Sequence, residues 1–358
     1  NLFFKKQNMK KKSLSAKKAA HKSLLNYLKN KKINKVFNHF RNYMDQNGKK
    51  NIRIGAAISG GPDSLALAFL TKCYSILNQS KVYFFIVDHK LRKESSKEAS
   101  SIKIFLKKFD INCEILKWYG KKPNSNVQGI ARKNRYKLLK KACSKKKISH
   151  LLVGHHIDDL YENFFIRLFR GSGLKGLSSF AYIFKKESDN INIFRPLIKF
   201  EKKDLIYISK SVFNFFVKDP SNQNYIFKRS RIRKLILDLN KEGFDKNKLN
   251  LTINNLKLAN DAIDFYVKKN IKNNARYIEN KHIYILNKYF FDQSEEIIFR
   301  SFSLVLKKIG GKYYSPRGKS ISDSIFKISA KKFNKFTLGG CFIEKASETI
   351  LITKEKHH

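Results

Sequence analysis

Between residues 52 and 170, short apolar runs alternate with stretches of helical length and periodicity, and no other feature constrains the fold as strongly. The apolar runs have the length of strands and lie at residues 52–58, 82–87, 111–118 and 150–154. The intervening stretches predict helices at residues 63–78, 93–109, 126–145 and 156–170. This order is typical of βαβ units and predicts an α/β fold with a doubly wound, mostly parallel sheet. Such sheets bind ligands beyond the carboxyl ends of their strands, so a site is expected just after Ile58, Val87 and Val153.

The flanking segments differ from this central part. Residues 1–46 predict a basic extension, which begins with lysine-rich, low-complexity sequence and continues into a helix between Leu24 and Met44. We expect the sheet-bearing domain to occupy residues 47–235 and a helical and small α+β region to occupy residues 236–358. In that last region the pattern predicts two helices, a short strand and a β-hairpin broken at Gly339 and Gly340; these elements lie at 249–270, 292–308, 283–285 and 336–352.

The chain carries 76 Lys and Arg against 28 Asp and Glu, a formal net charge of +48. Biased genome composition, nucleic-acid binding and an acidic membrane surface are three explanations. The basic residues are spread along the whole chain, which argues against a membrane patch, and no apolar run reaches the roughly 18–20 residues of a membrane span. A polyanionic partner, bound in a salt-sensitive way, is therefore the functional hypothesis.

The four cysteines, Cys73, Cys113, Cys143 and Cys341, are far apart and form no C-x-x-C pair. This spacing argues against a disulfide framework or a zinc ribbon and favours a reducing compartment such as the cytoplasm.

The segment after the first predicted strand reads Ser59-Gly60-Gly61-Pro62-Asp63-Ser64. Glycines allow a tight turn and a close approach to an anion, and the following helix begins with N–H groups directed at the same point. The alternative is an ordinary strand–helix turn with polar capping residues. The full string is rare at this position, so we interpret it as a phosphate-binding loop. No Walker-type G-x-x-x-x-G-K-[ST] occurs, and the G-x-G-x-x-G at 171–176 follows a helix, as expected of a helix C-cap and loop.

Charged and polar side chains also follow the second and fourth strands. Asp158 and Asp159 open the fourth predicted helix, where acidic residues are also common as caps, so the pattern alone leaves catalysis and capping equally open. His155 and His156 are adjacent, a spacing that disfavours metal binding by the pair. Other polar residues also have two interpretations, a contact with a ligand or a structural or solvated role. They are Asp88, His89, Arg132, Arg135, Arg229, Arg231 and Arg233.

The loop Ser59–Ser64 resembles the signature of the N-type ATP pyrophosphatases, the PP-loop family, which cleave ATP between the α and β phosphates. Further strings, in the same order and spacing, are similar to those of the tRNA(Ile)-lysidine synthetases within that family. They lie at 87–92, 129–136, 154–162, 170–173, 176–177, 195–197, 219–222 and 229–233. The resemblance is dense over residues 33–235 and fainter towards the C-terminus. Asn163 stands where the family usually has Thr, and Ser230 where Asn is usual.

The resemblance implies a fold, a reaction and its participants. The C2 oxygen of the wobble cytidine would attack the α-phosphate of ATP, and free L-lysine would then displace AMP to form lysidine. ATP and Mg²⁺ are the implied cofactors, and the isoleucine tRNA with a CAU anticodon and free lysine are the implied partners. The resemblance does not decide whether the chain forms a homodimer, and no membrane partner is expected.

The resemblance also implies roles for individual residues. ATP would be bound by Ser59, Gly60, Gly61, Pro62, Asp63, Ser64, Asp88 and His89. Asp63, Asp158 and Arg132 would be catalytic, with Asp63 also a Mg²⁺ ligand and Arg132 near the adenylate or an RNA phosphate. Lysine or tRNA would be bound by Asp159, Glu162, Arg135, Arg229, Arg231 and Arg233. The rivals are another PP-loop tRNA enzyme, such as a thiolase with paired cysteines, and a catalytically silent RNA-binding relative.

Overall fold

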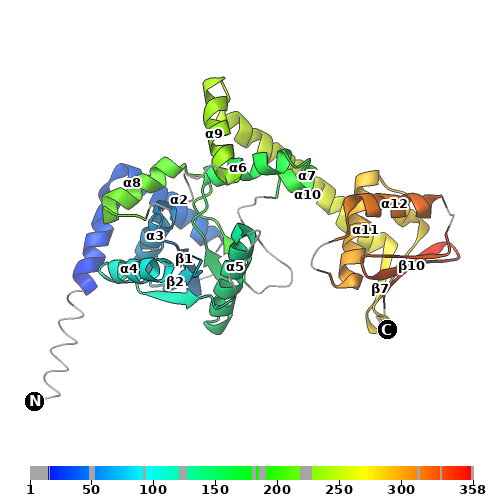
Figure 1. Cartoon of the computed structure of the whole chain (residues 1–358), viewed down its shortest axis with the longest axis horizontal. Helices are drawn as coiled ribbons and strands as arrows, with labels where there is room; N and C mark the ends of the chain where they lie inside the picture. The colour runs from blue at the N-terminus through cyan, green and yellow to red at the C-terminus, as the bar shows by residue number, and fades with distance from the viewer. Residues whose placement is uncertain are drawn as a thin grey trace, which may run out of the picture. The chain divides into compact units, whose positions relative to one another are not determined.

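The computed structural model describes residues 15, 17–47, 53–91, 94–120, 127–179, 183–184, 191–217, 228–312, 315–330 and 333–355, with residues 128, 183 and 184 described by backbone only. The first lysine-rich segment, Arg92, the string 219–222, Tyr313 and Tyr314 lie outside the described residues. The chain divides into two compact units, residues 1–172 with 180–246 and residues 173–179 with 247–358. Helices and strands of both units are labelled in Figure 1.

The first unit is built on a six-stranded sheet in the order β3-β2-β1-β4-β6-β5 among the described residues. Its strands are β1 (Arg53–Ile58), β2 (Lys81–Asp88), β3 (Cys113–Lys117), β4 (His150–Leu152), β5 (Ile183–Phe184) and β6 (Asn192–Phe194). All neighbouring pairs are parallel except β5 with β6. The predicted α/β class with a mostly parallel sheet is confirmed. The chain runs outward from β1 to β2 and β3 and returns to the other side of β1 at β4, so the strand order reverses between β1 and β4.

Helices cover this sheet at bounds close to the predicted ones. The predicted helices correspond to α3 (Pro62–Asn78), α4 (Ser95–Lys107), α5 (Val127–Lys145) and α6 (Ile157–Leu168). The helix expected between Leu24 and Met44 is interrupted: η1 (Tyr27–Lys29) precedes α2 (Lys31–Asn47). Asn30 causes the break, since its Oδ1 accepts hydrogen bonds from the N–H groups of Lys32 and Ile33, 3.0 and 3.3 Å away, and so caps α2.

Two helices and two strands of this unit were not predicted. These are β5, β6, α8 (Lys202–Phe213) and α9 (Lys228–Lys241). The predicted C-cap after α6 is confirmed, because Gly171 adopts φ = +67° and its N–H donates to the carbonyl of Leu168.

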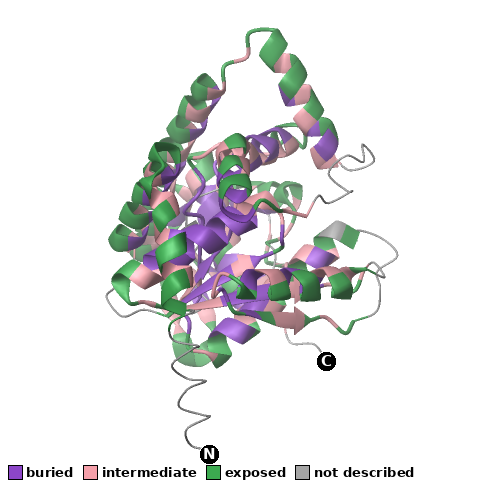
Figure 2. Cartoon of the chain, turned by 90° about the vertical axis from the view of Figure 1, so that its left-hand side faces the viewer, coloured by how far each residue is buried: buried purple, intermediate pink, exposed green. Residues whose placement is uncertain are grey.

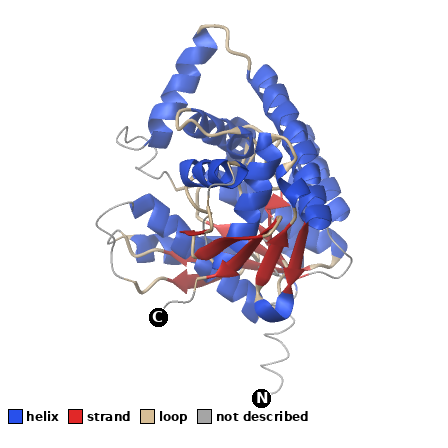
Figure 3. Cartoon of the chain, turned by 90° about the vertical axis from the view of Figure 1, so that its right-hand side faces the viewer, coloured by secondary structure: helices blue, strands red, loops and turns tan. Residues whose placement is uncertain are grey.

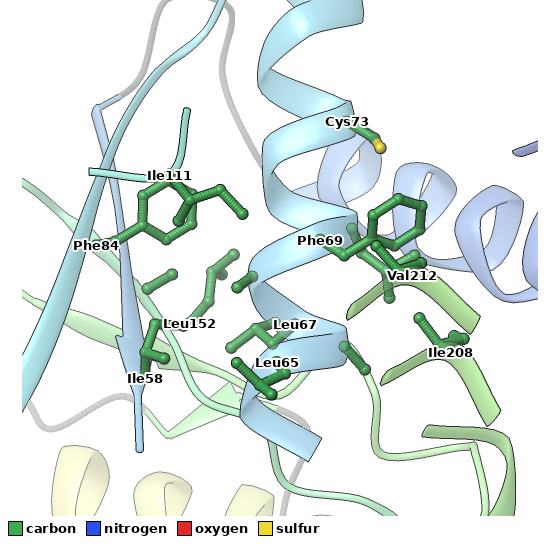
Figure 4. Close-up of a cluster of buried hydrophobic side chains, with 14 of the residues drawn as sticks. Ile58, Leu65, Leu67, Phe69, Cys73, Phe84, Ile111, Leu152, Ile208 and Val212 are labelled. Carbon is green, nitrogen blue, oxygen red and sulfur yellow. The ribbon is translucent and has the colours of Figure 1, made fainter. Parts of the chain in front are cut away.

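The core of the first unit surrounds α3, in which every residue from Ser64 to Tyr74 is buried. A helix that is apolar on all sides must be covered on all sides. Here the sheet covers one side through Ile58 and Leu152, and α8 covers another through Ile208 and Val212 (Figure 4). Figure 2 shows the buried residues gathered in the middle of the unit and the exposed residues on the outer faces of its helices. α3 is therefore held rigidly, and so is the loop that precedes it.

The second unit combines helices with an antiparallel sheet in the order β7-β8-β11-β10-β9 (Figure 3). Its helical elements are α7 (Leu174–Leu177), α10 (Lys246–Asn274), η3 (Glu279–Lys281), η4 (Lys288–Phe291), α11 (Glu295–Gly310) and α12 (Gly318–Ser329). Its strands are β7 (Ala275–Ile278), β8 (Ile283–Leu286), β9 (Lys335–Leu338), β10 (Cys341–Ala346) and β11 (Thr349–Lys354). The single hairpin expected at 336–352 was wrong: a second turn at Ser347, with φ = +55°, makes three strands. In the described parts of the chain, no helix is both long and apolar enough to cross a membrane.

Candidate active site

The loop after β1 is a compact turn held by its own hydroxyl groups. Ser64 Oγ donates to the carbonyl oxygen of Gly61 at 2.9 Å and accepts the N–H of Ser59 at 3.1 Å. Gly60 has φ = +82°, and a Cβ there would collide with Ile102, so only glycine fits. The N–H of Val217 donates to the carbonyl of Gly60 at 2.9 Å. The loop is thus held by its own hydrogen bonds, by Val217 and by the packing of Ile102.

The same loop leaves the N-terminus of α3 open to a ligand. Gly61 is the N-cap residue, in extended conformation, and no side chain caps the helix. A Cβ on Gly61 would meet a single neighbour, Ser59 Oγ at 3.8 Å, so there is space beside the backbone. First-turn N–H groups and the positive end of the helix dipole face this kind of space, which suits phosphate oxygens.

The segment after β4 lies directly against this loop. A Cβ on Gly154 would come 2.9 Å from the carbonyl oxygen of Asp63 and 3.3 Å from the N of Ser64, so the two backbones touch. The structure therefore brings the predicted phosphate loop and the residues that open α6 together at the point where the strand order reverses. The site expected after Ile58 and Val153 is one site.

Three carboxylates surround the buried imidazole of His156. Its Nε2 lies 3.7 Å from Asp63 Oδ2 and 3.6 Å from Asp159 Oδ2, and its Nδ1 lies 3.4 Å from Asp158 Oδ2. Burial alone would lower the pKa of His156, but the neighbouring carboxylates outweigh burial and raise it. Burial raises the pKa of Asp63, although the charge of His156 acts in the opposite direction. The three carboxylates thus share His156 as one proton-binding centre.

Asp158 and Asp159 have different surroundings. Asp158 accepts the N–H of Lys202 at 3.0 Å and the ammonium of Lys246 at 3.1 Å. Burial would raise its pKa, but the contacts with His156, Lys202 and Lys246 hold the pKa well below its ordinary value. Asp159 is buried, and its Oδ2 accepts the N–H of His156 at 3.1 Å, as in a capping box. Capping is therefore part of the role of Asp159, while Asp158 joins α6 to the start of α8 and to the side chain of Lys246.

Asp63 has the features of a metal-binding oxygen. Its Oδ1 is buried without a hydrogen-bond partner among the described residues. Mg²⁺ usually takes one or two carboxylates plus phosphate oxygens and water, so one orphaned carboxylate oxygen beside a phosphate loop fits a metal that arrives with ATP. Over the described ranges, no group of three or more His, Cys, Asp or Glu is arranged to hold a metal ion.

Two arginines of α9 act on acidic residues of α6. Arg233 forms an ion pair with Glu162, which is 1% exposed. Burial raises the pKa of Glu162 more than Arg233 lowers it. The charge of Arg229 contributes to lowering the pKa of Asp159, whereas Arg231 is exposed. The structure thus brings Arg233 into contact with α6 and Arg229 near it.

The hydrogen-bonded pair of His155 and Arg195 was not predicted from the sequence. Arg195 is buried, and its Nε donates to Nδ1 of His155 at 3.1 Å. Burial lowers the pKa of His155 to about 3, and the charges of Arg195, Arg132 and Arg229 act in the same direction, so the ring is neutral. The string at 195–197 was a signal for this residue, but the resemblance alone gave it no role. Arg132 lies over the ring of Tyr136, 5.2 Å from its centre.

At the carboxyl end of β2, Asp88 is buried and accepts the N–H of Lys90 at 3.0 Å and the hydroxyl of Ser96 at 2.6 Å. The first contact is that of an Asx turn and the second ties β2 to α4, so both contacts of Asp88 are structural. Nε2 of the neighbouring His89 accepts the Nε–H of Arg135 at 3.1 Å. Burial and the charge of Arg135 lower the pKa of His89 to about 4, so it is a neutral acceptor.

Comparison with known proteins agrees with this geometry. The family model of the PP-loop domain matches residues 26–240. The tRNA(Ile)-lysidine synthase of Wolbachia pipientis wMel is 33% identical over 319 residues, which cover 88% of this chain and 74% of that protein. The tRNA(Ile)-lysidine synthase of Orientia tsutsugamushi (strain Boryong) is 32% identical over 321 residues, 86% of this chain and 70% of that protein.

Among solved structures, the U34-tRNA thiolase NcsA from Methanococcus maripaludis, with its [4Fe-4S] cluster, matches with a TM-score of 0.54. It is 18% identical, and the match covers 65% of this chain and 79% of that chain, a likeness of fold. The sequence matches extend over most of both chains and include the loop after β1 and the segment after β4. The chain therefore belongs to the PP-loop proteins and, within them, to the tRNA(Ile)-lysidine synthase family.

Proposed function

We propose that this chain adenylates the C2 oxygen of the wobble cytidine in the isoleucine tRNA with a CAU anticodon and then joins free lysine to C2. Pyrophosphate leaves in the first step and AMP in the second. One observation supports this most strongly: an open helix N-terminus, suited to phosphates, and a carboxylate cluster, suited to an ammonium group, are in backbone contact at Gly154.

In the first step, we assign the phosphates to the backbone N–H groups of Gly60, Gly61 and Ser64, while the hydroxyls of Ser59 and Ser64 hold the loop in shape. Donors fixed in advance stabilise the charge that develops on the leaving pyrophosphate. Mg²⁺ bound with ATP would be held by Asp63 and would neutralise part of that charge. Arg132 is proposed to contact the adenylate or an RNA phosphate.

In the second step, the amine of lysine must be bound and deprotonated, since its pKa is about 10.4 in water. We assign this binding to Asp158, supported by Asp159. The hydrogen bond that Asp158 accepts from the ammonium of Lys246 supports this assignment, since an incoming lysine would take the place of Lys246. Attack on C2 forms the C–N bond, breaks the C–O bond to AMP and releases the amine proton to a neighbouring base.

Glu162 orients Arg233, and Arg229 lies on the same side of α9, so both are proposed to contact the RNA, together with Arg135. We also propose that residues 236–358 contribute to tRNA binding. Light scattering on the same preparation would measure the oligomeric state and show whether the chain forms a homodimer.

The test uses the full chain with ATP, Mg²⁺, labelled lysine and a transcript of the CAU-anticodon isoleucine tRNA. We expect AMP and pyrophosphate release and label in the RNA, and neither with a transcript whose wobble cytidine is changed to uridine. A folded protein that transfers no label would refute the proposal and would favour the silent RNA-binding alternative.

The thiolase alternative is disfavoured by the state of the cysteines. All four are free and buried, and burial raises the pKa of both Cys113 and Cys143 to about 12 and that of Cys341 to about 11. Sulfur transfer needs an accessible thiolate, and these surroundings oppose thiolate formation. Adding a sulfur donor in place of lysine should therefore give no thiolated RNA.

A further inference from the structure

An exposed aromatic ring and a lysine meet at the carboxyl edge of the sheet, and an arginine is bound to the residue next to that lysine. Asp88 of β2 is paired with Lys117 of β3, and the N–H of Trp118 extends the ladder by donating to the carbonyl of Asp88 at 3.0 Å. The next residue on one side is Tyr119, which is 79% exposed. Two residues beyond Asp88, Lys90 places its ammonium 4.4 Å from the centre of the Tyr119 ring.

The backbone of Lys90 is held in an unusual conformation. It has φ = +49°, in the left-handed region that residues other than glycine rarely adopt. The buried carboxylate of Asp88 accepts its N–H and maintains this turn. Strained residues that the surroundings hold in place are concentrated at functional sites. The turn brings the ammonium of Lys90 over the ring.

Arg135 supplies a second cation from a third element. It lies on α5, is exposed, and donates through Nε to Nε2 of His89, the residue before Lys90. This bond holds the guanidinium of Arg135 beside the turn at Lys90. Lys90 and Tyr119 thus meet beyond the ends of β2 and β3, and Arg135 of α5 is bound to the residue next to Lys90.

We infer that Tyr119, Lys90 and Arg135 form a platform for a single-stranded segment of the RNA substrate, in which an unpaired base stacks on Tyr119 and the two cations contact its phosphates. This inference rests on the proposed function. An exposed ring suits a strand that passes over the rim, since sites for small ligands bury most of the ligand surface. Base stacking on an aromatic ring combined with phosphate contacts is the usual chemistry of such strand binding.

The test compares variants of the full chain in fluorescence anisotropy with labelled tRNA transcript, and in ATP turnover. Tyr119→Ala should raise the Kd for the transcript about tenfold, as expected for the loss of one stacked base. Tyr119→Phe should retain wild-type binding because it keeps the ring. Lys90→Gln should reduce the slope of log Kd against log salt concentration by about 0.7, the value for one phosphate contact with a single strand.

Tyr207 provides a matched control. It lies on α8 in the same unit, and the ammonium of Lys32 is 5.2 Å from its ring centre, so Tyr207→Ala removes the same chemistry elsewhere. We expect it to leave the Kd unchanged, and none of the Tyr119 variants to alter the KM for ATP. Equal RNA binding by Tyr119→Ala and the wild type, or a raised KM for ATP with unchanged RNA binding, would overturn the inference. A wild-type chain that transfers no lysine would instead overturn the proposed function.

Discussion

The open space beside Gly61 predicts a variant that should lose ATP binding without losing its fold. A Cβ at this position meets only Ser59 Oγ, at 3.8 Å, so Gly61→Ala introduces no clash in the protein itself. The backbone needs no change either, since Gly61 has φ = −72°, which alanine adopts readily. The methyl group would, however, occupy the space that we assign to a phosphate oxygen.

Two effects on stability should nearly cancel. Alanine is a poorer N-cap than glycine and should cost about 0.5–1 kcal/mol. Replacing glycine also reduces the conformational entropy of the unfolded chain, which should return about 0.4–1 kcal/mol. For ATP, losing one hydrogen bond to a charged group should cost about 1.5–3 kcal/mol. The KM for ATP should therefore rise about ten- to hundredfold, while the free energy of unfolding changes by less than about 1 kcal/mol.

Gly173 offers a matched control, because it is also an N-cap glycine in extended conformation, at the start of α7, with φ = −69°. A Cβ there would meet nothing within 4 Å. Gly173→Ala should leave both ATP turnover and unfolding unchanged. The measurements are pyrophosphate release at varied ATP concentration and urea unfolding of each variant. If Gly61→Ala bound ATP as well as the wild type, the phosphates would have to lie elsewhere, and the assignment of the loop would be wrong.

Two further predictions concern the carboxylates of the first unit. Asp158→Asn should abolish lysine transfer with the fold retained, whereas Lys246→Met should keep transfer if Asp158 binds substrate lysine; equal loss in both would show that Asp158 acts only by anchoring α10. Burial raises the pKa of Asp110, but hydrogen bonds from Lys72 and His21 outweigh burial and lower it, so its stabilisation is present above about pH 4 and is lost as the pH falls. Asp110→Asn should accordingly lower the urea midpoint at neutral pH and remove part of the loss seen on acidification; a parallel pH profile would contradict this.

Most of the first unit could be predicted from sequence because its strands are apolar runs and its helices have a clear period. β6 could not, since it has three residues and exists by pairing with β4. The turn at Ser347 was missed for a related reason. Neither glycine nor proline marks it, and its conformation is imposed by the pairing of β10 with β11.

The site was predictable in its location and less so in its contacts. The carboxyl-end rule for parallel sheets placed the loop after β1 beside the segment after β4. The different positions of the three arginines could also have been predicted once α9 is known to be a helix. Residues 229 and 233 then share one face of the helix, and residue 231 lies on another. The partner of Asp158 was not, because Lys246 is 88 positions away in the chain and only the folded arrangement of α6 and α10 brings it near.

The proposed reaction requires an anion and a cation to be bound close together, in a chain whose net charge is +48. Lysine side chains around the loop would attract ATP but would repel the ammonium group of the second substrate. The structure separates these requirements. The N-terminus of α3 offers backbone N–H donors, which carry no net charge, while the carboxylates of Asp63, Asp158 and Asp159 are gathered around His156. Uncharged donors for the phosphates and full negative charges for the ammonium group would allow both substrates to be bound near each other, and the surplus of lysine would be left to serve the RNA.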